Sequence, residues 1–334
     1  MKQLTILVPN GEGNNLSSII GSYKIFSRAN ELMQQQGKNP VFQIKLAGVS
    51  DSQSYYNGLF NIKPHTTISN IKKTDLIIIP AINFHHPDIF EQNKSLIIWL
   101  ENQYQKGAEI ASICTGAFLL ASTGLMNGKK CSTHWAARES FMEKFPEVDL
   151  QTDLLITDES GIYTNGGAYS FLNLLFYLVE KYYNRQVALI CSKIFQIDLS
   201  RHSQSEFAIF SNQKMHADDV VKQAQIYIES NIEEKISIDY LCQKFSVARR
   251  NFDRRFVKAT GNSPLEYMQR VKIEAAKRAL ETTMKNINEV MFEVGYNDIK
   301  AFREVFKRIT GLTPTDYKLK YSKSYTDYVV NVAR

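Results

Sequence analysis

The chain has 334 residues, of which 44% are hydrophobic and 22% are charged, and its formal net charge is +6. This composition is typical of a globular protein of about two domains and excludes a collagen-like, disordered or disulfide-scaffold chain. No apolar run approaches the ~20 residues needed to span a bilayer, and the N-terminus becomes polar too soon for a signal peptide.

The cysteine pattern indicates a reducing compartment. Cys114, Cys131, Cys191 and Cys242 lie far apart, with no CxxC pair and no histidine at metal-ligand spacing. We therefore expect neither a disulfide framework nor a metal site, no cofactor, and a cytoplasmic location.

Residues 1–202 alternate strand-like apolar runs with longer amphipathic stretches. In chain order, the expected strands and helices are Leu4–Val8, Ile19–Gln36, Val41–Leu46, Leu76–Ile79, Glu91–Gln105, Glu109–Ile113, Thr115–Thr123, Ala136–Phe145, Leu154–Thr157, Gly161–Thr164 and Tyr169–Tyr183. Strands that alternate with helices predict a mostly parallel sheet covered on both faces, which is a three-layer α/β domain.

Cys114 stands between an expected strand and a helix that begins with small residues. A helix N-terminus favours the thiolate, and His134 follows downstream, so the two are a candidate nucleophile and base. The pattern also fits a Cys114 that only packs in the core and a His134 that only forms a core hydrogen bond. Further candidate pocket residues follow strands or lie in a turn: Asn83, Phe84, Thr115, Asn165 and Gly166.

A polar stretch with weak periodicity, residues 203–217, predicts a linker. From Asp218 to about Tyr321 the pattern is helical, so we expect an all-helical domain over 218–321 and a tail over 322–334. Basic and acidic residues balance at 18 each in residues 1–211, whereas residues 212–334 carry 22 basic and 16 acidic residues. This asymmetry indicates a module that binds a polyanion, with a solvated basic face as the alternative.

Two segments of the helical domain each predict a short helix, a tight turn and a second helix. The second helices carry aromatic pairs at i, i+4 spacing, Phe252 with Phe256 and Phe302 with Phe306, which can anchor one face in a core. A longer helix that begins at Pro264 joins the segments. The sequence therefore predicts two linked helix-turn-helix units.

The polar faces of these second helices are rich in basic residues. A B-DNA major groove admits an α-helix, and arginine and asparagine suit the edges of guanine and adenine. The candidate DNA-contacting residues are Arg249, Arg250, Asn251, Arg254 and Arg255 in the first unit, and Asn297, Lys300, Arg303 and Lys307 in the second. We expect the two helices to enter successive major grooves about 34 Å apart.

These units resemble the DNA-binding domain of AraC/XylS-type transcription regulators. The first resemblance lies in Ala248-x-Arg250-x-Phe252-x-Arg254-x-Phe256 and Thr260-Gly261-x-Ser263-Pro264-x-x-Tyr267. The second lies in Val294-Gly295-Tyr296, Phe302-Arg303-x-x-Phe306-Lys307 and Thr310-Gly311-x-Thr313-Pro314-x-x-Tyr317. Ala248 stands where the family commonly has a serine, which implies a helix cap weaker by ~1 kcal/mol.

The first domain resembles the PfpI-type branch of class I glutamine amidotransferase-like domains over about residues 3–200. The resemblance rests on the strand–Cys114–helix elbow, Thr133-His134-Trp135 and Thr164-Asn165-Gly166-Gly167, and it implies a flavodoxin-like fold. Active members bring an acid to the cysteine. Here Ser18 stands at that place, with Glu12 as the substitute, and the loop after Leu76–Ile79 lacks the glycines of an oxyanion site. Ser18 therefore joins the candidate pocket residues.

Together the two resemblances imply a sequence-specific DNA-binding transcription regulator. We expect its partners to be double-stranded promoter DNA, a small-molecule effector of unknown identity and a second copy of the chain, with RNA polymerase as a further candidate and no membrane. The first domain is expected to sense the effector and to dimerise without catalysis. The alternatives are a cysteine-dependent amidohydrolase or hydratase with an accessory DNA-binding domain, and a thiol sensor that uses Cys114.

Overall fold

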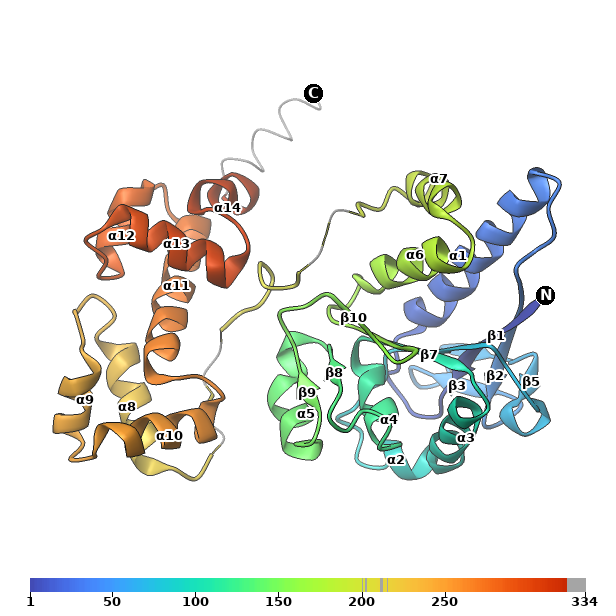
Figure 1. The fold of residues 1–334 in the computed structure, drawn as a ribbon, viewed down its shortest axis with the longest axis horizontal. Helices are drawn as coiled ribbons and strands as arrows, with labels where there is room; N and C mark the ends of the chain where they lie inside the picture. The colour runs from blue at the N-terminus through green and yellow to red at the C-terminus, as the bar shows by residue number, and fades with distance from the viewer. Residues whose placement is uncertain (200, 202, 211–212, 215, 323–334) are drawn as a thin grey trace. The chain divides into compact units, whose positions relative to one another are not determined.

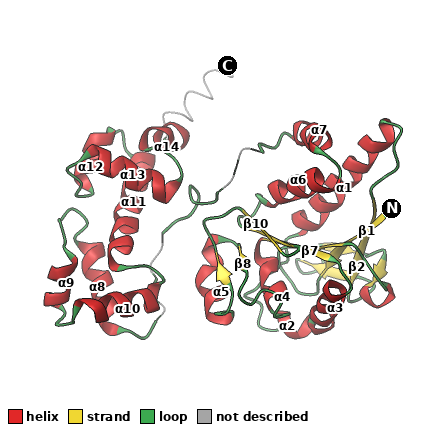
Figure 2. Cartoon of the chain, in the orientation of Figure 1, coloured by secondary structure: helices red, strands yellow, loops and turns green. Residues whose placement is uncertain are grey.

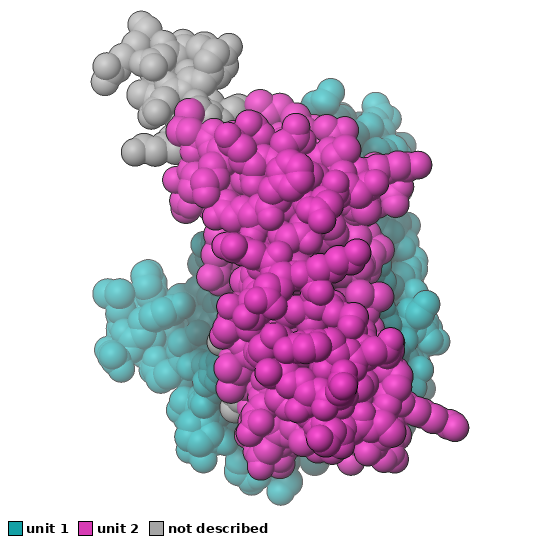
Figure 3. Space-filling model, turned by 90° about the vertical axis from the view of Figure 1, so that its left-hand side faces the viewer, with its two compact units in different colours: residues 1–204 teal, residues 205–334 magenta. Residues whose placement is uncertain are grey.

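The computed structural model describes residues 1–199, 201, 203–210, 213–214 and 216–322. The chain divides into two compact units, residues 1–204 and 205–334, which are coloured separately in Figure 3. Strands occur in the first unit, and the second is helical (Figure 2). Of the expected tail, residues 323–334 lie outside the described residues. Within the described part of the chain, every helix is too short or too polar to cross a membrane.

A seven-stranded sheet forms the centre of the first unit, in the order β10-β11-β7-β6-β1-β2-β5 (Figure 1). Neighbouring strands are parallel except β10, which is antiparallel to β11. The strands are β1 (Lys2–Val8), β2 (Phe42–Gly48), β5 (Thr66–Thr67), β6 (Leu76–Ile79), β7 (Glu109–Ile113), β10 (Ile156–Glu159) and β11 (Ile162–Asn165). Two short pairings lie outside it, β3 (Gln53–Tyr55) with β4 (Phe60–Ile62) and β8 (Lys130–Cys131) with β9 (Asp149–Leu150). The expected mostly parallel sheet is confirmed.

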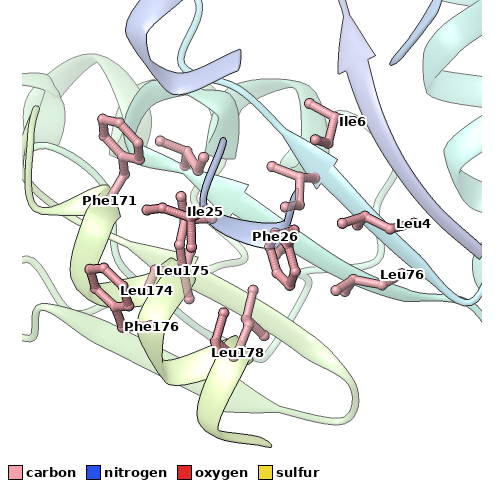
Figure 4. Close-up of a cluster of buried hydrophobic side chains, with 14 of the residues drawn as sticks. Leu4, Ile6, Ile25, Phe26, Leu76, Phe171, Leu174, Leu175, Phe176 and Leu178 are labelled. Atoms are coloured by element: carbon pink, nitrogen blue, oxygen red, sulfur yellow. The ribbon is translucent and has the colours of Figure 1, made fainter. Parts of the chain in front are cut away.

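Helices cover both faces of this sheet because successive side chains of a strand point to opposite sides. Leu4 and Ile6 of β1 belong to one core, with Phe26 of α1, and Leu7 belongs to the other (Figure 4). The first core involves α1 (Leu16–Gln35), α6 (Phe171–Tyr182) and α7 (Arg185–Phe195). The second involves α2 (Ile89–Gln92), α3 (Lys94–Gln105), α4 (Ala117–Ala121) and α5 (Arg138–Lys144). The three-layer architecture is the one that the sequence predicts, although the sequence did not indicate α7 or β5.

The strand order reverses at β1, which pairs with β2 on one side and with β6 on the other. In open α/β sheets, ligands bind outside the carboxyl ends of the strands at such a reversal. The loops that follow β1, β2 and β6 meet at this edge. Three 3₁₀ turns complete the unit, Ile68–Asn70, Cys114–Gly116 and Trp135–Ala137.

The second unit consists of α8 (Asp219–Ser230), α9 (Ile238–Lys244), α10 (Arg249–Thr260), α11 (Pro264–Thr282), α12 (Ile287–Glu293), α13 (Ile299–Thr310) and α14 (Pro314–Tyr321). It has two cores. Tyr267 and Val271, in the first half of α11, pack in one core with Phe252. Ile273 and Leu280, further along the same helix, pack in the other. Helix α11 is therefore shared by both helix-turn-helix segments.

Local sequence signals set the ends of these helices. The Ser237 and Asp298 side chains accept hydrogen bonds from the first turns of α9 and α13, as caps do. Ala248 begins α10 without a side-chain cap. Gly295 adopts a φ of +72° just after α12, a conformation that costs glycine little. These features confirm the expected pattern of two short helix–turn–helix segments.

Candidate functional site

Cys114 sits in a strained turn directly after β7. Its φ of +52° lies in the left-handed region, which is uncommon for a residue with a side chain. The Cys114 N–H donates to Asn165 Oδ1 at 3.1 Å, and Thr133 Oγ1 donates to the Cys114 carbonyl at 2.9 Å. A Cβ at Gly116 would lie 2.6 Å from the Pro80 carbonyl oxygen, so the turn also requires a glycine there. These contacts hold the cysteine backbone in its strained conformation.

The Cys114 thiol is only 5% exposed. Burial raises its pKa to about 11, against weaker lowering by hydrogen bonds from Thr115 and from the His134 backbone. The His134 ring is not among the groups that shift the Cys114 pKa, and its Nδ1 accepts from the Ala136 N–H at 3.2 Å. Burial also lowers the pKa of His134, so the imidazole is neutral at pH 7. No carboxylate is among the groups that shift the Cys114 pKa.

We expect iodoacetamide to modify Cys114 very slowly in the native protein at pH 7. A rise of the pKa from 9.0 to about 11 lowers the thiolate fraction by about 100-fold at neutral pH, and burial restricts access further. Site-resolved mass spectrometry should show fast labelling of Cys114 only after unfolding in urea. Native labelling within a few-fold of the unfolded rate would contradict this and restore the thiol-sensor alternative.

The other predicted pocket residues divide between two neighbourhoods. Thr115, Asn165 and His134 lie against Cys114. Ser18 is buried, where its Oγ donates to the Asn15 carbonyl at 2.6 Å and accepts from the Ala81 N–H at 3.1 Å, so its hydrogen bonds support the loop after β6. Asn83 Nδ2 donates to the Glu12 carbonyl at 3.3 Å.

Phe84 and Gly166 have packing neighbours that the sequence did not reveal. Phe84 stacks on Phe118, with ring centroids 4.3 Å apart. A Cβ at Gly166 would lie 1.9 Å from Gln204 Nε2, because the Gln204 side chain occupies that space.

The polar pattern places Gln204 in the linker, yet its side chain is buried in the first unit. Its Nε2 donates to the Thr133 carbonyl at 2.9 Å, and its Oε1 accepts from the Trp135 N–H at 3.3 Å. Ser203 forms a β-bridge with Leu154 beside it. The segment Thr133–Trp135 thus contacts both Cys114 and Gln204.

A polar cleft of about 370 Å³ lies at the carboxyl edge of the sheet. Its lining residues come from the loops after β1, β2 and β6 and from α2: Asn10, Gly11, Glu12, Ser50, Gln53, His86 and Gln92. The volume suits a small ligand, and the position is the strand-order reversal at which such sheets bind one. None of the predicted pocket residues lines this cleft. The expected strand ends could have indicated it, because Asn10–Glu12 follow the first of them.

Helix α10 presents Arg250, Asn251 and Arg254 to solvent. Its opposite face carries Phe252 and Phe256, both fully buried. Arg254 Nη2 donates to Asn251 Oδ1 at 3.1 Å, which aligns these two polar groups on the exposed side. The predicted arrangement of an aromatic inner face and a basic outer face is therefore present.

Arg249 and Arg255 lie nearer the edges of that face and contact acidic side chains. Arg255 binds Asp218 through two hydrogen bonds of 2.8 and 2.6 Å, and its guanidinium holds the Asp218 pKa below its usual value. Arg249 donates to Asp253 at 3.0 Å and to Asp239 at 2.9 Å. Both arginines thus have partners inside the helical unit.

Helix α13 presents Lys300, Arg303 and Lys307 to solvent, and Asn297 is exposed in the turn before it. Phe302 and Phe306 are fully buried. Five exposed positions of the two helices are not among the predicted residues: Val257, Lys258, Ala301, Glu304 and Arg308. Spacing by 3.6 residues from the phenylalanine pairs indicates all five.

Comparison with known families matches each unit separately. The DJ-1/PfpI family profile matches residues 22–181, and a helix-turn-helix domain profile matches residues 241–320. The HTH-type transcriptional regulator GbdR of Pseudomonas aeruginosa is 26% identical over 221 residues, which are 66% of this chain and 60% of that protein. The HTH-type transcriptional regulator CdhR of the same species is 23% identical over 266 residues, 78% of this chain and 76% of that protein.

Among solved structures, a ThiJ/PfpI family protein from Pseudomonas syringae aligns with a TM-score of 0.50 at 17% identity, covering 69% of this chain and 86% of that one. This similarity shows a shared fold. The chain covers only 60% of the length of GbdR.

Proposed function

We propose that this chain, in which a domain of the DJ-1/PfpI family precedes a C-terminal helix-turn-helix domain, is a sequence-specific DNA-binding transcription regulator of the AraC type. The observation that carries the proposal is the pair of helices α10 and α13. Each is anchored by two buried phenylalanines and presents basic side chains on its opposite face. Curated relatives that align with both units are named as transcriptional regulators.

The charge of the two exposed faces supports DNA as the ligand. Seven basic side chains lie on them: Arg250, Arg254 and Lys258 on α10, and Lys300, Arg303, Lys307 and Arg308 on α13. Lysine and arginine that approach phosphates release condensed counterions, which is the main sequence-independent source of DNA affinity. We call α10 and α13 the recognition helices. Helix α11, which packs against both of them, has 19 residues and is therefore about 28 Å long. This length is close to one turn of B-DNA, the spacing of successive major-groove sites.

We propose that the first unit binds a small-molecule effector, dimerises and does not catalyse a reaction. The protonated thiol of Cys114 argues against a nucleophile and base pair, and the Nδ1 of His134 accepts from the Ala136 N–H. The polar cleft beside Glu12 is the candidate effector site, ahead of the packed surroundings of Cys114. Promoter DNA, a second copy of the chain and RNA polymerase are the proposed macromolecular partners, and the cytoplasm is the proposed compartment.

The test is selection of bound duplexes from a pool of randomised DNA by the full chain. We expect enrichment of one sequence motif. For the selected duplex, fluorescence anisotropy should give a slope of about −4 to −5 for log K against log salt, because four to six phosphate contacts contribute ~0.9 each. Absence of an enriched motif, or a slope near zero, would contradict the proposed DNA-binding function.

A further inference from the structure

The two recognition helices are equivalent position by position, at an offset of 50 residues. Phe252 matches Phe302 and Phe256 matches Phe306, and all four side chains are fully buried. Both helices end at a glycine with positive φ, Gly261 at +70° and Gly311 at +81°. The threonine before each glycine bonds back to the second phenylalanine carbonyl, at 2.9 and 2.8 Å. Exposed residues of the two helices can therefore be compared one to one.

Arg254 and Glu304 occupy equivalent positions on the two helices and carry opposite charges. At about 100° per residue, each lies roughly 180° from the mean direction of its phenylalanine pair, at the centre of the exposed face. A helix that enters the major groove with its buried face outward directs this central position toward the base pairs. The first unit has a guanidinium at this point, and the second has a carboxylate.

Basic side chains surround Glu304 without neutralising it. Lys300 and Arg308 lie one turn before and after it, and both are exposed. Arg308 Nη2 instead donates to Gln269 Oε1 at 2.6 Å. Among the described residues, no ion pair includes Glu304. A free carboxylate at the centre of a basic face repels the DNA phosphates. Its favourable partner on DNA is therefore a hydrogen-bond donor.

We propose that Glu304 is a specificity-determining residue that accepts a hydrogen bond from the N4 amino group of one cytosine. A carboxylate offers only acceptors, and in the major groove cytosine presents a donor that suits glutamate. Arg254, at the equivalent position of the first unit, suits the O6 and N7 acceptors of guanine. The two half-sites of the operator therefore differ at their equivalent central base pair. This inference rests on the proposed DNA-binding function.

The experiment repeats the selection from randomised duplexes with the full-length wild type, Glu304→Ala, Glu304→Gln and Glu233→Ala. Glu233 is an exposed acid between α8 and α9, so its substitution makes the same change in charge outside α10 and α13. For Glu304→Ala we expect the same motif as for the wild type, except that one cytosine position becomes degenerate. Discrimination at that base pair should fall from about 5- to 100-fold to none, without loss of overall affinity. Glu304→Gln should change the preference there toward adenine, because glutamine pairs with its N6 and N7.

The outcomes separate the two proposals. If Glu304→Ala selects the same base as the wild type at every position, Glu304 does not recognise a base and the inference is overturned. Loss of all binding by a Glu304→Ala protein with an unchanged melting temperature overturns it as well. A wild type that selects no motif removes the DNA-binding proposal itself, and the inference with it. A Glu233→Ala protein with the wild-type motif excludes a general effect of charge.

Discussion

Replacing both Arg250 and Arg254 with alanine is expected to weaken binding to a selected operator by at least about 30-fold. Each bidentate arginine–guanine contact provides about 1–3 kcal/mol of discrimination, and two such losses combine. The two side chains are exposed on α10, so the fold should not change. Fluorescence anisotropy with the selected duplex measures the loss, and circular dichroism checks the helices.

A matched control removes two arginines elsewhere. Arg185 and Arg278 have side chains that are 61% and 69% exposed, and they lie on α7 and α11 rather than on a recognition helix. The double substitution to alanine makes the same change in net charge. We expect it to reduce affinity by no more than a few-fold. If the control loses as much affinity as the α10 variant, the effect comes from net charge, and α10 is not the contact surface.

Lys277→Ala should destabilise the helical unit by about 3–5 kcal/mol. Lys277 and Glu274 are buried on α11, with their charged groups 3.0 Å apart. Lys277 also donates to the Ala208 carbonyl at 2.6 Å, and Glu274 accepts from the Phe210 N–H at 3.1 Å. Removal of one partner leaves the other as a buried and poorly compensated charge, which is the costly case.

The same pair gives an internal check, since replacing both partners by apolar residues often costs little. Urea unfolding should show that the Lys277→Met, Glu274→Leu double variant retains more stability than Lys277→Ala alone. A double variant that is less stable than the single variant would mean that the ion pair itself supplies the stability. A cost under 1 kcal/mol for Lys277→Ala would mean that the charges are hydrated.

Local sequence signals were enough to predict the helical unit, because its helices begin and end at caps and turns that involve neighbouring residues. Ser237 and Asp298 cap α9 and α13, and Gly295 takes the positive φ in the turn after α12. Tertiary partners were not visible at this level. Arg255 binds Asp218, which lies 37 residues away in the sequence. The local pattern that places Arg255 on the DNA-contacting face does not reveal this competing acid.

The first unit shows the same division between local and distant information. Alternating strands and helices predicted the parallel sheet, and the strand–helix junction located Cys114 correctly at a turn. The cleft is built from three loops that are far apart in the chain, and its shape follows only from the strand order. Gln204 stands in a polar stretch, and its side chain is buried because Gly166 leaves room for it and the Thr133–Trp135 backbone supplies its hydrogen bonds.

Because both cores share α11, neither helix-turn-helix segment can be excised as an independent folding unit. A chain that stopped after Thr282 would leave Ile273, Ala276 and Leu280 as an apolar stripe in water, since their partners on α12 and α13 would be missing. A chain that began after Val271 would keep Ile273, Ala276 and Leu280, but it would lose the first half of α11 and also Ile232, which packs against the second core from the loop between α8 and α9. Each truncation therefore exposes apolar side chains that are buried in the full chain.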